Sequence, residues 1–429
     1  MVATSISQVI ADPSCMDDYD PNAMHVAKAR QFIRQFLSPV SETEILPIRD
    51  SLGRVLAADI LSPTNVPNYD NSAMDGYAFN SADIAKSKTF KVIGTTFAGK
   101  AFRGEIQSGE CVRIMTGGMM PKGADTVIMQ EKIKVDADLI SIIEAPKPKA
   151  NVRYAGEDLQ KGNMVLARGH LMRAADLGLI ASLGIGEVSV SRKLKVAFFS
   201  TGDELASVGE TLKEGQVHDS NRYTLYGMLS RLGVEIIDIG AIADDRELLE
   251  QTLLSAAKQA DVVITSGGIS VGEADYMKLL LAKHGQVMFW KIAMKPGRPL
   301  AYGKIIADEE SNAHYFGLPG NPVAVMVTFY QFVREALFIL MGQPNPTPPV
   351  LFHVICTESI RKMTGRTEFQ RGILFTDSDG TLKVKPTGSQ GSAILSSMSL
   401  ANCFIVLGDD VGNLEAGALV QVQVLDGIV

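Results

Sequence analysis

The sequence predicts a multidomain fold of the α/β plus β class. Apolar strands and helices alternate regularly from Leu194 to Gly342, which indicates βαβ crossovers and a doubly wound α/β domain with a parallel-rich sheet. Between Leu61 and Asp158 the helical period fades, and short β-rich runs lie between Gly and Pro turns. A second β-rich stretch follows Gly342. At about 150 residues per domain, the 429 residues leave room for roughly three domains.

Residues 22–60 and 159–193 are expected to form a helical packing arm. Val26, Ala29, Ile33 and Phe36 fall on one face of a helix, and a second short helix is expected to begin near Asp50 as its N-cap. An amphipathic stretch from Ala174 to Leu183 would return the chain to this arm. Residues 61–158 then form an inserted small β domain, with runs at Phe90–Ile93, Cys111–Met115 and Thr126–Met129.

Residues 194–342 are predicted to form the α/β domain. We expect strands at Val196–Ser200, Val234–Ile239, Val262–Thr265, Val287–Ile292 and around Tyr315–Leu318. Helices are expected at Asn221–Leu232, Arg246–Ala260 and Tyr276–His284. A long last helix follows, which Asn321 can cap with Pro322 at its first position.

Residues 350–429 are predicted to form a C-terminal β domain. Gln343–Pro349 is rich in proline and makes a stiff linker to it. The alternating runs Leu382–Lys385 and Cys403–Leu407 indicate strands, and Asp379-Gly380 indicates a hairpin turn.

The composition favours a soluble enzyme over a nucleic-acid or membrane protein. Lys and Arg number 41 against 48 Asp and Glu, a net charge of −7, so any anionic ligand needs a local basic site. The four cysteines, Cys15, Cys111, Cys356 and Cys403, form no CxxC pair, which favours a reducing compartment. The first 25 residues lack the pattern of a signal peptide, and charges interrupt the apolar stretch from Pro322 to Gly342. A cytoplasmic location is expected.

Polar residues follow each predicted strand of the α/β domain, where ligands bind in such sheets. Asp203 follows the first strand, and Asp219 lies shortly before the next helix. Asp203 could be only a turn residue and Asp219 only a helix cap. Their shared position at a strand end, however, suits Mg²⁺, a hard cation that binds one or two carboxylates in proteins. Asp244 and Asp245 follow the second strand, and one of them is expected to cap a helix.

The third strand leads into a glycine-rich turn. Ser266, Gly267, Gly268 and Ser270 allow the backbone to approach a phosphate closely, and Asp275 stands at the entry to the next helix. A glycine-rich turn alone is a weak signal of function.

Cations collect after the fourth strand. Lys291 lies within that strand, and Lys295, Arg298 and Pro299 belong to a loop stiffened by proline and glycine. Such a loop favours binding of an oxyanion over a merely solvated role. The last strand end, Gly317–Pro322, opens a helix N-terminus, whose dipole also favours an anion.

Eight motifs in one order resemble those of the molybdopterin molybdenumtransferases, the bacterial molybdenum insertases, to which the C-terminal domain of gephyrin is similar. The motifs are Asp70–Tyr77 (DNSAMDGY), Arg113–Gly117, Gly156–Asp158, Ser200–Leu205, Asp219–Arg222, Ser266–Gly272, Lys295–Pro299 and Gly317–Pro322. The resemblance extends from about Ala27 to Val424.

The resemblance implies an elongated cytoplasmic homodimer with four domains, in which residues 22–60 and 159–193 also serve dimerisation. It implies the insertion of molybdate into adenylated molybdopterin, with AMP released and Mg²⁺ required, and partners that include the molybdopterin adenylyltransferase and molybdoenzyme chaperones. Carried over by motif, the functional positions are Asp75, Thr116, Asp158, Glu204, Asp244, Asp275, Lys291, Lys295, Pro319, Pro322, Arg371 and Ser392. The chain departs from the commoner family pattern at Arg298, where lysine is usual, and at Ala324, where serine is usual.

From these residues we form one hypothesis and keep two alternatives. Lys295, Arg298 and Arg371 would hold molybdate, the glycine-rich loop would seat phosphates, and Mg²⁺ would bind among Asp203, Asp219, Asp244 and Asp275. Asp75 would act across the dimer interface, unless it only holds its own tight loop. The alternatives are an adenylyltransferase or nucleotide pyrophosphatase on the same α/β domain, and a non-catalytic scaffold like the gephyrin domain.

Overall fold

The structure is a computed structural model, which describes residues 23–268 and 276–425. The chain divides into two compact units. One unit comprises the described parts of Met1–Glu44, Gly53–Val55 and Ser191–Val429, and the other comprises Ile45–Leu52 and Leu56–Val190. Mixed sheets, covering helices and a separate C-terminal sheet confirm the predicted α/β plus β class.

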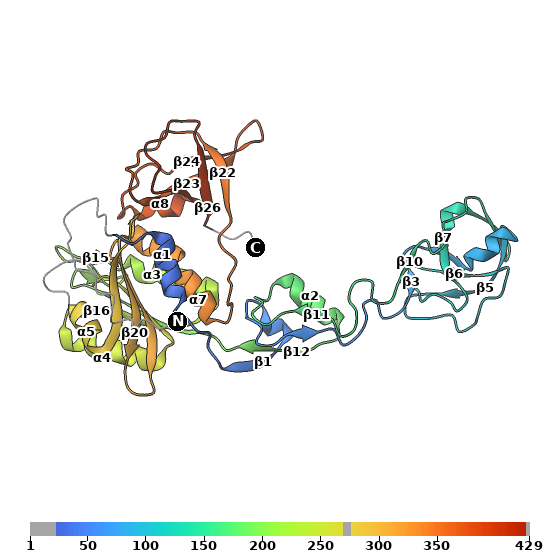
Figure 1. The fold of residues 1–429 in the computed structure, drawn as a ribbon, viewed down its shortest axis with the longest axis horizontal. Coiled ribbons are helices and arrows are strands. Elements are labelled where there is room, and N and C mark those ends of the chain that lie inside the picture. Colours follow the sequence, from blue (N-terminus) through green and yellow to red (C-terminus); the bar gives the residue numbers. More distant parts are fainter. Residues whose placement is uncertain (1–22, 269–275, 426–429) are drawn as a thin grey trace, which may run out of the picture. The chain divides into compact units, whose positions relative to one another are not determined.

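The unit that contains residues 56–190 is built on a six-stranded sheet of order β7-β4-β6-β5-β9-β8 (Figure 1). These strands are β4 Gly76–Phe79, β5 Thr89–Thr96, β6 Glu110–Ile114, β7 Thr126–Met129, β8 Ile133–Asp136 and β9 Leu139–Ile142. Buried apolar residues such as Phe79, Phe90 and Ile140 form its core. The three runs predicted for this segment coincide with β5, β6 and β7, except that β6 ends at Ile114, one residue before the predicted end.

Short paired strands and one helix complete that unit. The pairs are β2 Ile60–Leu61 with β11 Met164–Leu166, β3 Asn71–Ser72 with β10 Val152–Arg153, and β1 Thr43–Pro47 with β12 Glu187–Ser191. The helix α2, Ala174–Ser182, matches the predicted amphipathic stretch. The second short helix is a 3₁₀ turn, Ile48–Ser51, so Asp50 lies inside it and Pro47 holds the N-cap position instead.

The other unit contains a six-stranded sheet of order β16-β13-β17-β21-β20-β18 (Figure 1). Its strands are β13 Lys195–Thr201, β16 Glu235–Ile242, β17 Val262–Ser266, β18 Gly285–Lys291, β20 Pro299–Ile306 and β21 Asn312–Leu318. The first four strands in this order run parallel, whereas β20 is antiparallel to both of its neighbours. The sequence did not predict β20, because its proline, glycine and lysine follow a charged loop.

Helices cover both faces of this sheet, as a doubly wound fold requires. The helices α4 (Arg246–Gln259) and α5 (Tyr276–His284) share one core with Phe199, Val263 and Tyr315 of the strands. The helix α3 (Ser220–Leu232) contacts β13 and α6 (Pro322–Thr328), and α6 contacts β21. Asp219 and Asp245 cap α3 and α4 with their side chains, so their predicted structural roles are confirmed.

The last helix of the sheet domain is continuous from Pro322 to Leu340, through α6, a π-helical turn at Phe329–Val333 and α7 (Arg334–Leu340). Its length and hydropathy would allow a membrane span, but 72% of it is buried inside the protein, as in a core helix. Asn321 occupies the N-cap position without a side-chain cap; its amide donates to Ser392 Oγ instead. The predicted positions of Asn321 at the N-cap and Pro322 at the helix start are confirmed, although Asn321 makes no side-chain capping bond.

The helix α1, Val26–Arg34, packs against this same long helix. Val26, Ala29 and Ile33 are buried, as the predicted face requires. Arg30 Nε donates to the carbonyl of Gln331 at 2.8 Å. The helix α1 belongs to the unit with the α/β sheet, whereas Ile45–Leu52 and the residues from Leu56 onward belong to the other unit.

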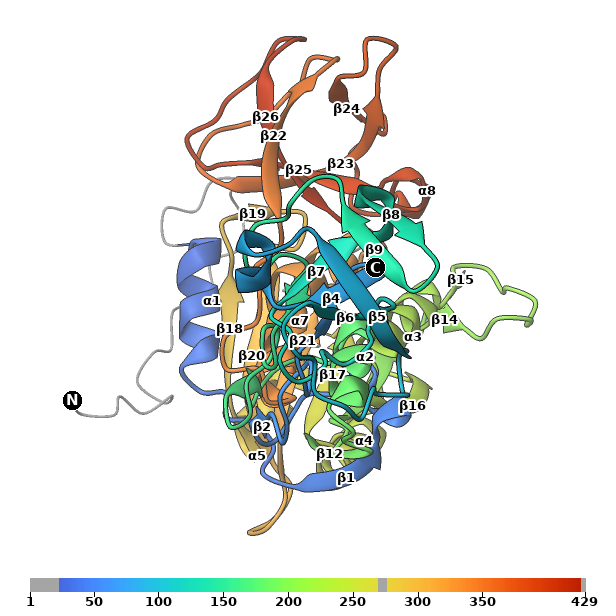
Figure 2. The same ribbon diagram turned by 90° about the vertical axis from the view of Figure 1, so that its right-hand side faces the viewer.

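The C-terminal residues form a third sheet, of order β19-β23-β24-β22-β26-β25, with α8 beside β23 (Figure 2). Its members are β19 Met294–Lys295, β22 Leu351–Cys356, β23 Thr367–Thr376, β24 Leu382–Pro386, β25 Cys403–Leu407 and β26 Leu419–Val424, and α8 spans Leu395–Leu400. The strand β19 comes from the α/β domain, so backbone pairing joins the predicted cationic loop to the C-terminal sheet.

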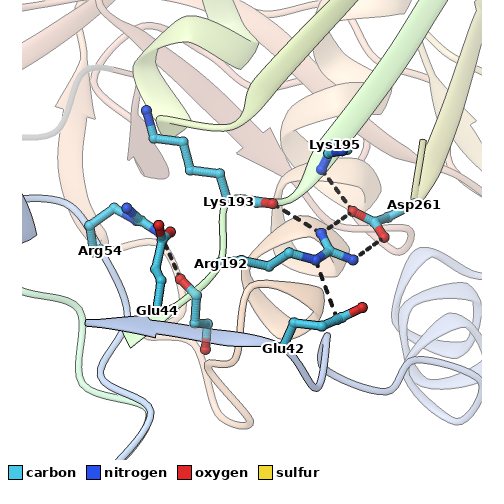
Figure 3. Close-up of polar contacts among 8 residues, drawn as sticks. Glu42, Glu44, Arg54, Arg192, Lys193, Lys195 and Asp261 are labelled. Atoms are coloured by element: carbon cyan, nitrogen blue, oxygen red, sulfur yellow. Dashed lines mark hydrogen bonds and ion pairs between the residues drawn. The ribbon is translucent and has the colours of Figure 1, made fainter. Parts of the chain in front are cut away.

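A charged cluster holds together the segments at which the chain passes between the units (Figure 3). Arg192 makes two hydrogen bonds of 2.7 Å to the carboxylate of Asp261 and an ion pair of 3.3 Å with Glu42. Arg54 contacts Glu44 and donates to the carbonyl of Ser191. The hydrogen bonds that Arg192 donates to the Asp261 carboxylate raise the pKa of Arg192. Within the unit that contains the α/β sheet, these polar contacts therefore link residues 42–44, 54 and 191–192 to Asp261, just before β17.

Candidate active site

A cavity of about 1430 Å³ lies at the carboxyl ends of β13, β17 and β21, between the α/β sheet and residues of the C-terminal domain. Within the described part of the chain, most of the predicted site residues of this unit line it. They are Glu204, Asp219, Asp244, Gly267, Gly268, Lys295, Arg298, Pro299, Pro319, Pro322 and Ser392. The rule that ligands bind beyond the strand ends of an α/β sheet therefore located the cavity.

The remaining predicted residues lie elsewhere. Asp203, Ser266, Lys291 and Arg371 belong to the same unit but do not line the cavity, whereas Asp75, Thr116 and Asp158 belong to the other unit. Ser270 and Asp275 lie outside the described residues.

Asp219 has one oxygen in a structural role and one without a partner. Its Oδ1 accepts from the backbone N–H of Arg222 at 3.1 Å and so caps α3. Its Oδ2 is buried and has no hydrogen-bond partner among the described residues. Leaving a buried carboxylate oxygen unbonded costs free energy, so Oδ2 is suited to a ligand that supplies a proton or a positive charge. Asp203 lies beside Asp244, since its Oδ1 accepts from the backbone N–H of Asp244 at 3.0 Å.

Asn221, two residues later, joins two of the strand ends around the cavity. Its amide nitrogen donates to Ser266 Oγ at 2.8 Å and to the carbonyl of Gly320 at 2.7 Å. Its Oδ1 is buried without a partner in the described structure. Asn221 was predicted as the start of a helix and as part of the motif Asp219–Arg222, but not as a site residue; its place two residues after Asp219 was the available signal.

The glycine-rich turn passes so close to the end of β13 that side chains are excluded. Gly267 has φ +88°, and a Cβ on it would lie 2.6 Å from the carbonyl oxygen of Thr201. A Cβ on Gly268 would lie 2.7 Å from Thr201 Oγ1, a buried hydroxyl without a partner in the described residues. The two glycines therefore permit a close contact between β13 and β17 that no other residue allows.

The cationic loop is held from two sides. Lys295 pairs with Glu368 where β19 runs parallel to β23. On the other side Gly297, with φ +98°, packs against α6, where a Cβ would lie 2.5 Å from Thr328 Oγ1. Lys291 ends β18 with its backbone in register with Pro299. The loop that carries Lys295 and Arg298 is thus rigid, as an oxyanion site requires.

Arg371 does not reach the cavity. Its guanidinium is buried and donates to Ser397 Oγ at 3.0 Å and to the carbonyls of Ser389 and Gly391. Burial lowers the pKa of Arg371 to about 10. In this structure Arg371 supports the loop that carries Ser392, so the geometry does not favour the direct molybdate contact expected from the sequence.

That loop covers the N-terminus of α6. The backbone N–H of Val323 donates to the carbonyl of Ser392 at 3.1 Å, and Pro322 has no N–H. The first two positions of this helix therefore offer no free backbone N–H to a ligand, and the expected effect of the helix dipole on an anion stays a prediction. Ala324, where the commoner family residue is serine, lines the cavity.

Arg366 lines the cavity although the sequence analysis passed over it. It lies five positions before Arg371, just ahead of β23, and forms an ion pair of 3.3 Å with Glu368 through Nε. Nothing in the local sequence distinguishes it from Arg371, because only the strand pairing decides which arginine faces the cavity.

In the other unit, Asp75 and Thr116 contact each other. Asp75 Oδ1 accepts from the backbone N–H of Thr116 at 2.7 Å and from its hydroxyl at 2.8 Å. These bonds, the backbone one foremost, lower the pKa of Asp75 below its ordinary value. Asp158 is exposed, and its backbone N–H donates to Val66. Asp75 thus does hold its own loop, and its exposed position leaves its carboxylate accessible as well.

The acidic residues fit a magnesium ion that substrate would complete. Residues 23–268 and 276–425 contain no group of three or more His, Cys, Asp or Glu that could hold a metal ion by itself. Mg²⁺, however, usually takes one or two carboxylates and completes its shell with phosphate and water. The unbonded Oδ2 of Asp219 and the cavity positions of Asp244 and Glu204 meet that lesser requirement.

Fold and cavity together indicate an α/β enzyme whose cavity at the strand ends is lined by carboxylates and cations. Three family models match the chain: the MoeA N-terminal region (domain I and II) at residues 24–184, a probable molybdopterin binding domain at 197–338, and the MoeA C-terminal region (domain IV) at 353–425. The chain belongs to the molybdopterin molybdenumtransferase (MoeA) family and is accordingly a transferase.

Individual relatives agree. A molybdopterin molybdenumtransferase of Haemophilus influenzae is 46% identical over 92% of this chain and 97% of its own length. One of Nostoc is 35% identical over 86% of each chain. The crystal structure of a molybdopterin biosynthesis moeA protein from Pyrococcus horikoshii matches with a TM-score of 0.80 at 29% identity, over 94% of this chain and all of that one.

Proposed function

We propose that this chain inserts molybdate into adenylated molybdopterin, with Mg²⁺-dependent release of AMP, to give molybdenum cofactor. Family membership and the names of its relatives support molybdenum transfer in cofactor biosynthesis. The observation that supports the finer proposal is that Lys295, Arg298, Asp219 and Asp244 line one cavity.

The cations solve an electrostatic problem. Molybdate is a dianion, and the adenylated substrate carries a pyrophosphate. Two like charges ~4 Å apart repel by about 1 kcal/mol in water and by several times that in a partly dry cleft. Lys295 and Arg298, on a loop braced by Gly297 and by β19, would hold the oxyanion without reorganising.

The backbone around the glycine turn would seat the phosphates. Gly267 and Gly268 bring bare backbone to the cavity wall, and Asn221 ties Ser266 to Gly320 so that the two turns keep their spacing. A bound Mg²⁺ would neutralise charge on the pyrophosphate and favour its cleavage, and Asp219 and Asp244 are the residues we assign to hold it, with Asp203 behind Asp244.

We further propose that the active protein is a cytoplasmic homodimer and that Asp75, Thr116 and Asp158 serve the site of the partner subunit. The exposed carboxylate of Asp75, kept ionised by its two bonds from Thr116, is suited to contact a ligand outside its own unit.

The test is anaerobic incubation of the purified chain with adenylated molybdopterin, Mg²⁺ and molybdate, following AMP by chromatography. AMP should appear only when molybdate and Mg²⁺ are both present. Release that is independent of molybdate would favour a nucleotide pyrophosphatase on the same α/β domain. No release under any condition would favour a binding scaffold and contradict the proposal.

A further inference from the structure

The C-terminal domain forms one wall of the cavity, so its orientation on the α/β domain sets the distance between the walls. Ser392 lines the cavity from the C-terminal domain, and Lys295 lines it from the α/β domain. Backbone bonds join the two domains at two places near the cavity. The Thr367 N–H donates to the carbonyl of Ala293 at 3.0 Å, and the Val323 N–H donates to that of Ser392 at 3.1 Å. Two places define only an axis, about which a domain can still turn.

A third contact lies further along the long helix, at Tyr330 and Gln331. The Nε2 of Gln331 donates to Gln423 Oε1 at 3.0 Å, and both residues are buried. The ring centroids of Tyr330 and Phe404 lie 6.0 Å apart, edge to face, and Phe404 is the cross-strand partner of Gln423. Gln331 follows Val323 by about 12 Å along the helix axis. The third contact therefore resists turning of the C-terminal domain about the axis near the cavity.

Arg30 of α1 fixes the direction in which the amide of Gln331 points. Its Nε donates to the backbone carbonyl of Gln331 at 2.8 Å, and its Nη2 donates to Oε1 of the same residue. A guanidinium can only donate hydrogen bonds, so the amide oxygen must face Arg30 and Nε2 must face Gln423. Gln331 belongs to the π-helical turn Phe329–Val333, and such turns are rare and frequent at functional sites. A directed chain of bonds thus runs from α1 through the long helix to β26.

We propose that Gln331 is a positioning residue of this site, which holds the C-terminal domain in the orientation that binds ligand. Gln331 does not line the cavity and acts through Gln423. Without their bond the buried amide of Gln423 loses its donor, which favours orientations of the domain in which this amide reaches water. The apparent KM rises as the fraction of competent chain falls, whereas kcat at saturation is kept. The inference rests on the proposed function for the ligand and the assayed reaction alone.

Four variants separate this role from a general effect on stability. Gln331→Leu removes the amide at similar volume, whereas Gln331→Glu keeps both contacts, because a carboxylate accepts from Arg30 and from the Gln423 amide once that amide has turned. Arg30→Met removes the group that directs Gln331. The control Arg34→Met removes the ion pair of 3.1 Å between α1 and Glu335 of the same long helix and leaves the bonds of Gln331 in place.

The first measurement is hydrogen exchange of the full chain by mass spectrometry, which is independent of the reaction. The N–H groups of Val323 and Thr367 should exchange about fivefold faster or more in Gln331→Leu and Arg30→Met. They should exchange at the wild-type rate in Gln331→Glu and Arg34→Met. The core strands β13 and β17 should keep wild-type exchange in all four variants.

The second measurement is the rate of AMP release against molybdate concentration. In Gln331→Leu and Arg30→Met, the KM for molybdate should rise about threefold or more, while kcat stays within about twofold of the wild-type value. Gln331→Glu and Arg34→Met should keep the wild-type KM.

Unchanged exchange of Val323 and Thr367 in Gln331→Leu would overturn the proposal. Equally accelerated exchange in β13 and β17 would overturn it as well, because the loss would then be one of general stability, and so would an unchanged KM for molybdate. If Gln331→Leu does not fold, Arg30→Met against Arg34→Met carries the comparison. A wild-type chain that releases no AMP would contradict the proposed function, and the exchange rates alone would then decide this inference.

Discussion

At the scale of single residues, the site combines structural and chemical roles in one side chain. Asp219 caps α3 with Oδ1 and keeps Oδ2 buried without a partner in the described structure. Thr201 and Asn221 also line the cavity, and each has a buried polar atom that the described residues do not bond, Thr201 Oγ1 and Asn221 Oδ1. Such groups cost stability in the free protein, and a ligand that bonds to them recovers it.

Substitutions of Asp219 separate its two roles. Asp219→Asn keeps a good cap and removes the charge, so the free energy of unfolding should stay the same or rise, while molybdate-dependent AMP release falls about 100-fold or more. Asp219→Ala should lose the same activity and also about 1 kcal/mol of stability. Asp245→Ala is the control, because Asp245 caps α4 in the same way and does not line the cavity. Full AMP release by Asp219→Asn would show that Asp219 serves only as the helix cap of α3 and would contradict its role in the site.

At the scale of elements, the cavity depends on turns that bring strands and helices closer than side chains permit. Gly267 and Gly268 let the end of β17 touch Thr201 of β13, and Gly297 lets the cationic loop touch α6. Because these contacts are made through backbone, they preserve the spacing of amides and cations around a small, highly charged ligand.

Two glycines with positive φ test this. Gly233 ends α3 with φ +72° and has open space around a Cβ, whereas a Cβ on Gly267 meets backbone at 2.6 Å. Gly233→Ala should cost about 1 kcal/mol in denaturant unfolding and keep AMP release. Gly267→Ala should cost roughly twice that or more and lose AMP release, because the β17 turn must move. Equal losses of stability and equal AMP release in the two variants would contradict the importance of the contact between Gly267 and Thr201.

Local chemistry explains how far the sequence could predict these elements. The helices α3 and α4 were predictable because Asp219 and Asp245 are strong caps and apolar residues follow at helical spacing. The strand β20 was missed because proline and glycine within it imitate a loop. The roles of Arg366 and Arg371 were not predictable, since Lys295 pairs with Glu368 across more than seventy positions of sequence. Such pairing has no local signal.

At the scale of the whole molecule, the chain passes between its two units at residues 44–45, 52–53, 55–56 and 190–191. Ion pairs hold these segments in the unit that contains the α/β sheet. They join Arg192 to Asp261 and Glu42, and Arg54 to Glu44. Asp75, Thr116 and Asp158 belong to the other unit. For this reason we propose that they serve a site shared by two subunits.

Mixed subunits test that assignment. Asp75→Asn and Lys295→Ala chains should each be inactive alone. After unfolding and refolding of an equal mixture, about half of the dimers carry one chain of each kind, and each of these contains one intact site of two, so about a quarter of the wild-type rate of AMP release should return. Activity that stays at the level of the separate variants would contradict sharing.

The central claim is that the cations of this cavity hold molybdate during cofactor formation, and Lys295→Ala tests it most directly. The rate of molybdate-dependent AMP release should fall about 100-fold or more, with an unchanged melting temperature, because one preorganised charge is lost from the oxyanion site. The control Lys193→Ala removes an exposed lysine that does not line the cavity, and it should release AMP at the wild-type rate. Equal rates in the two variants would contradict the account.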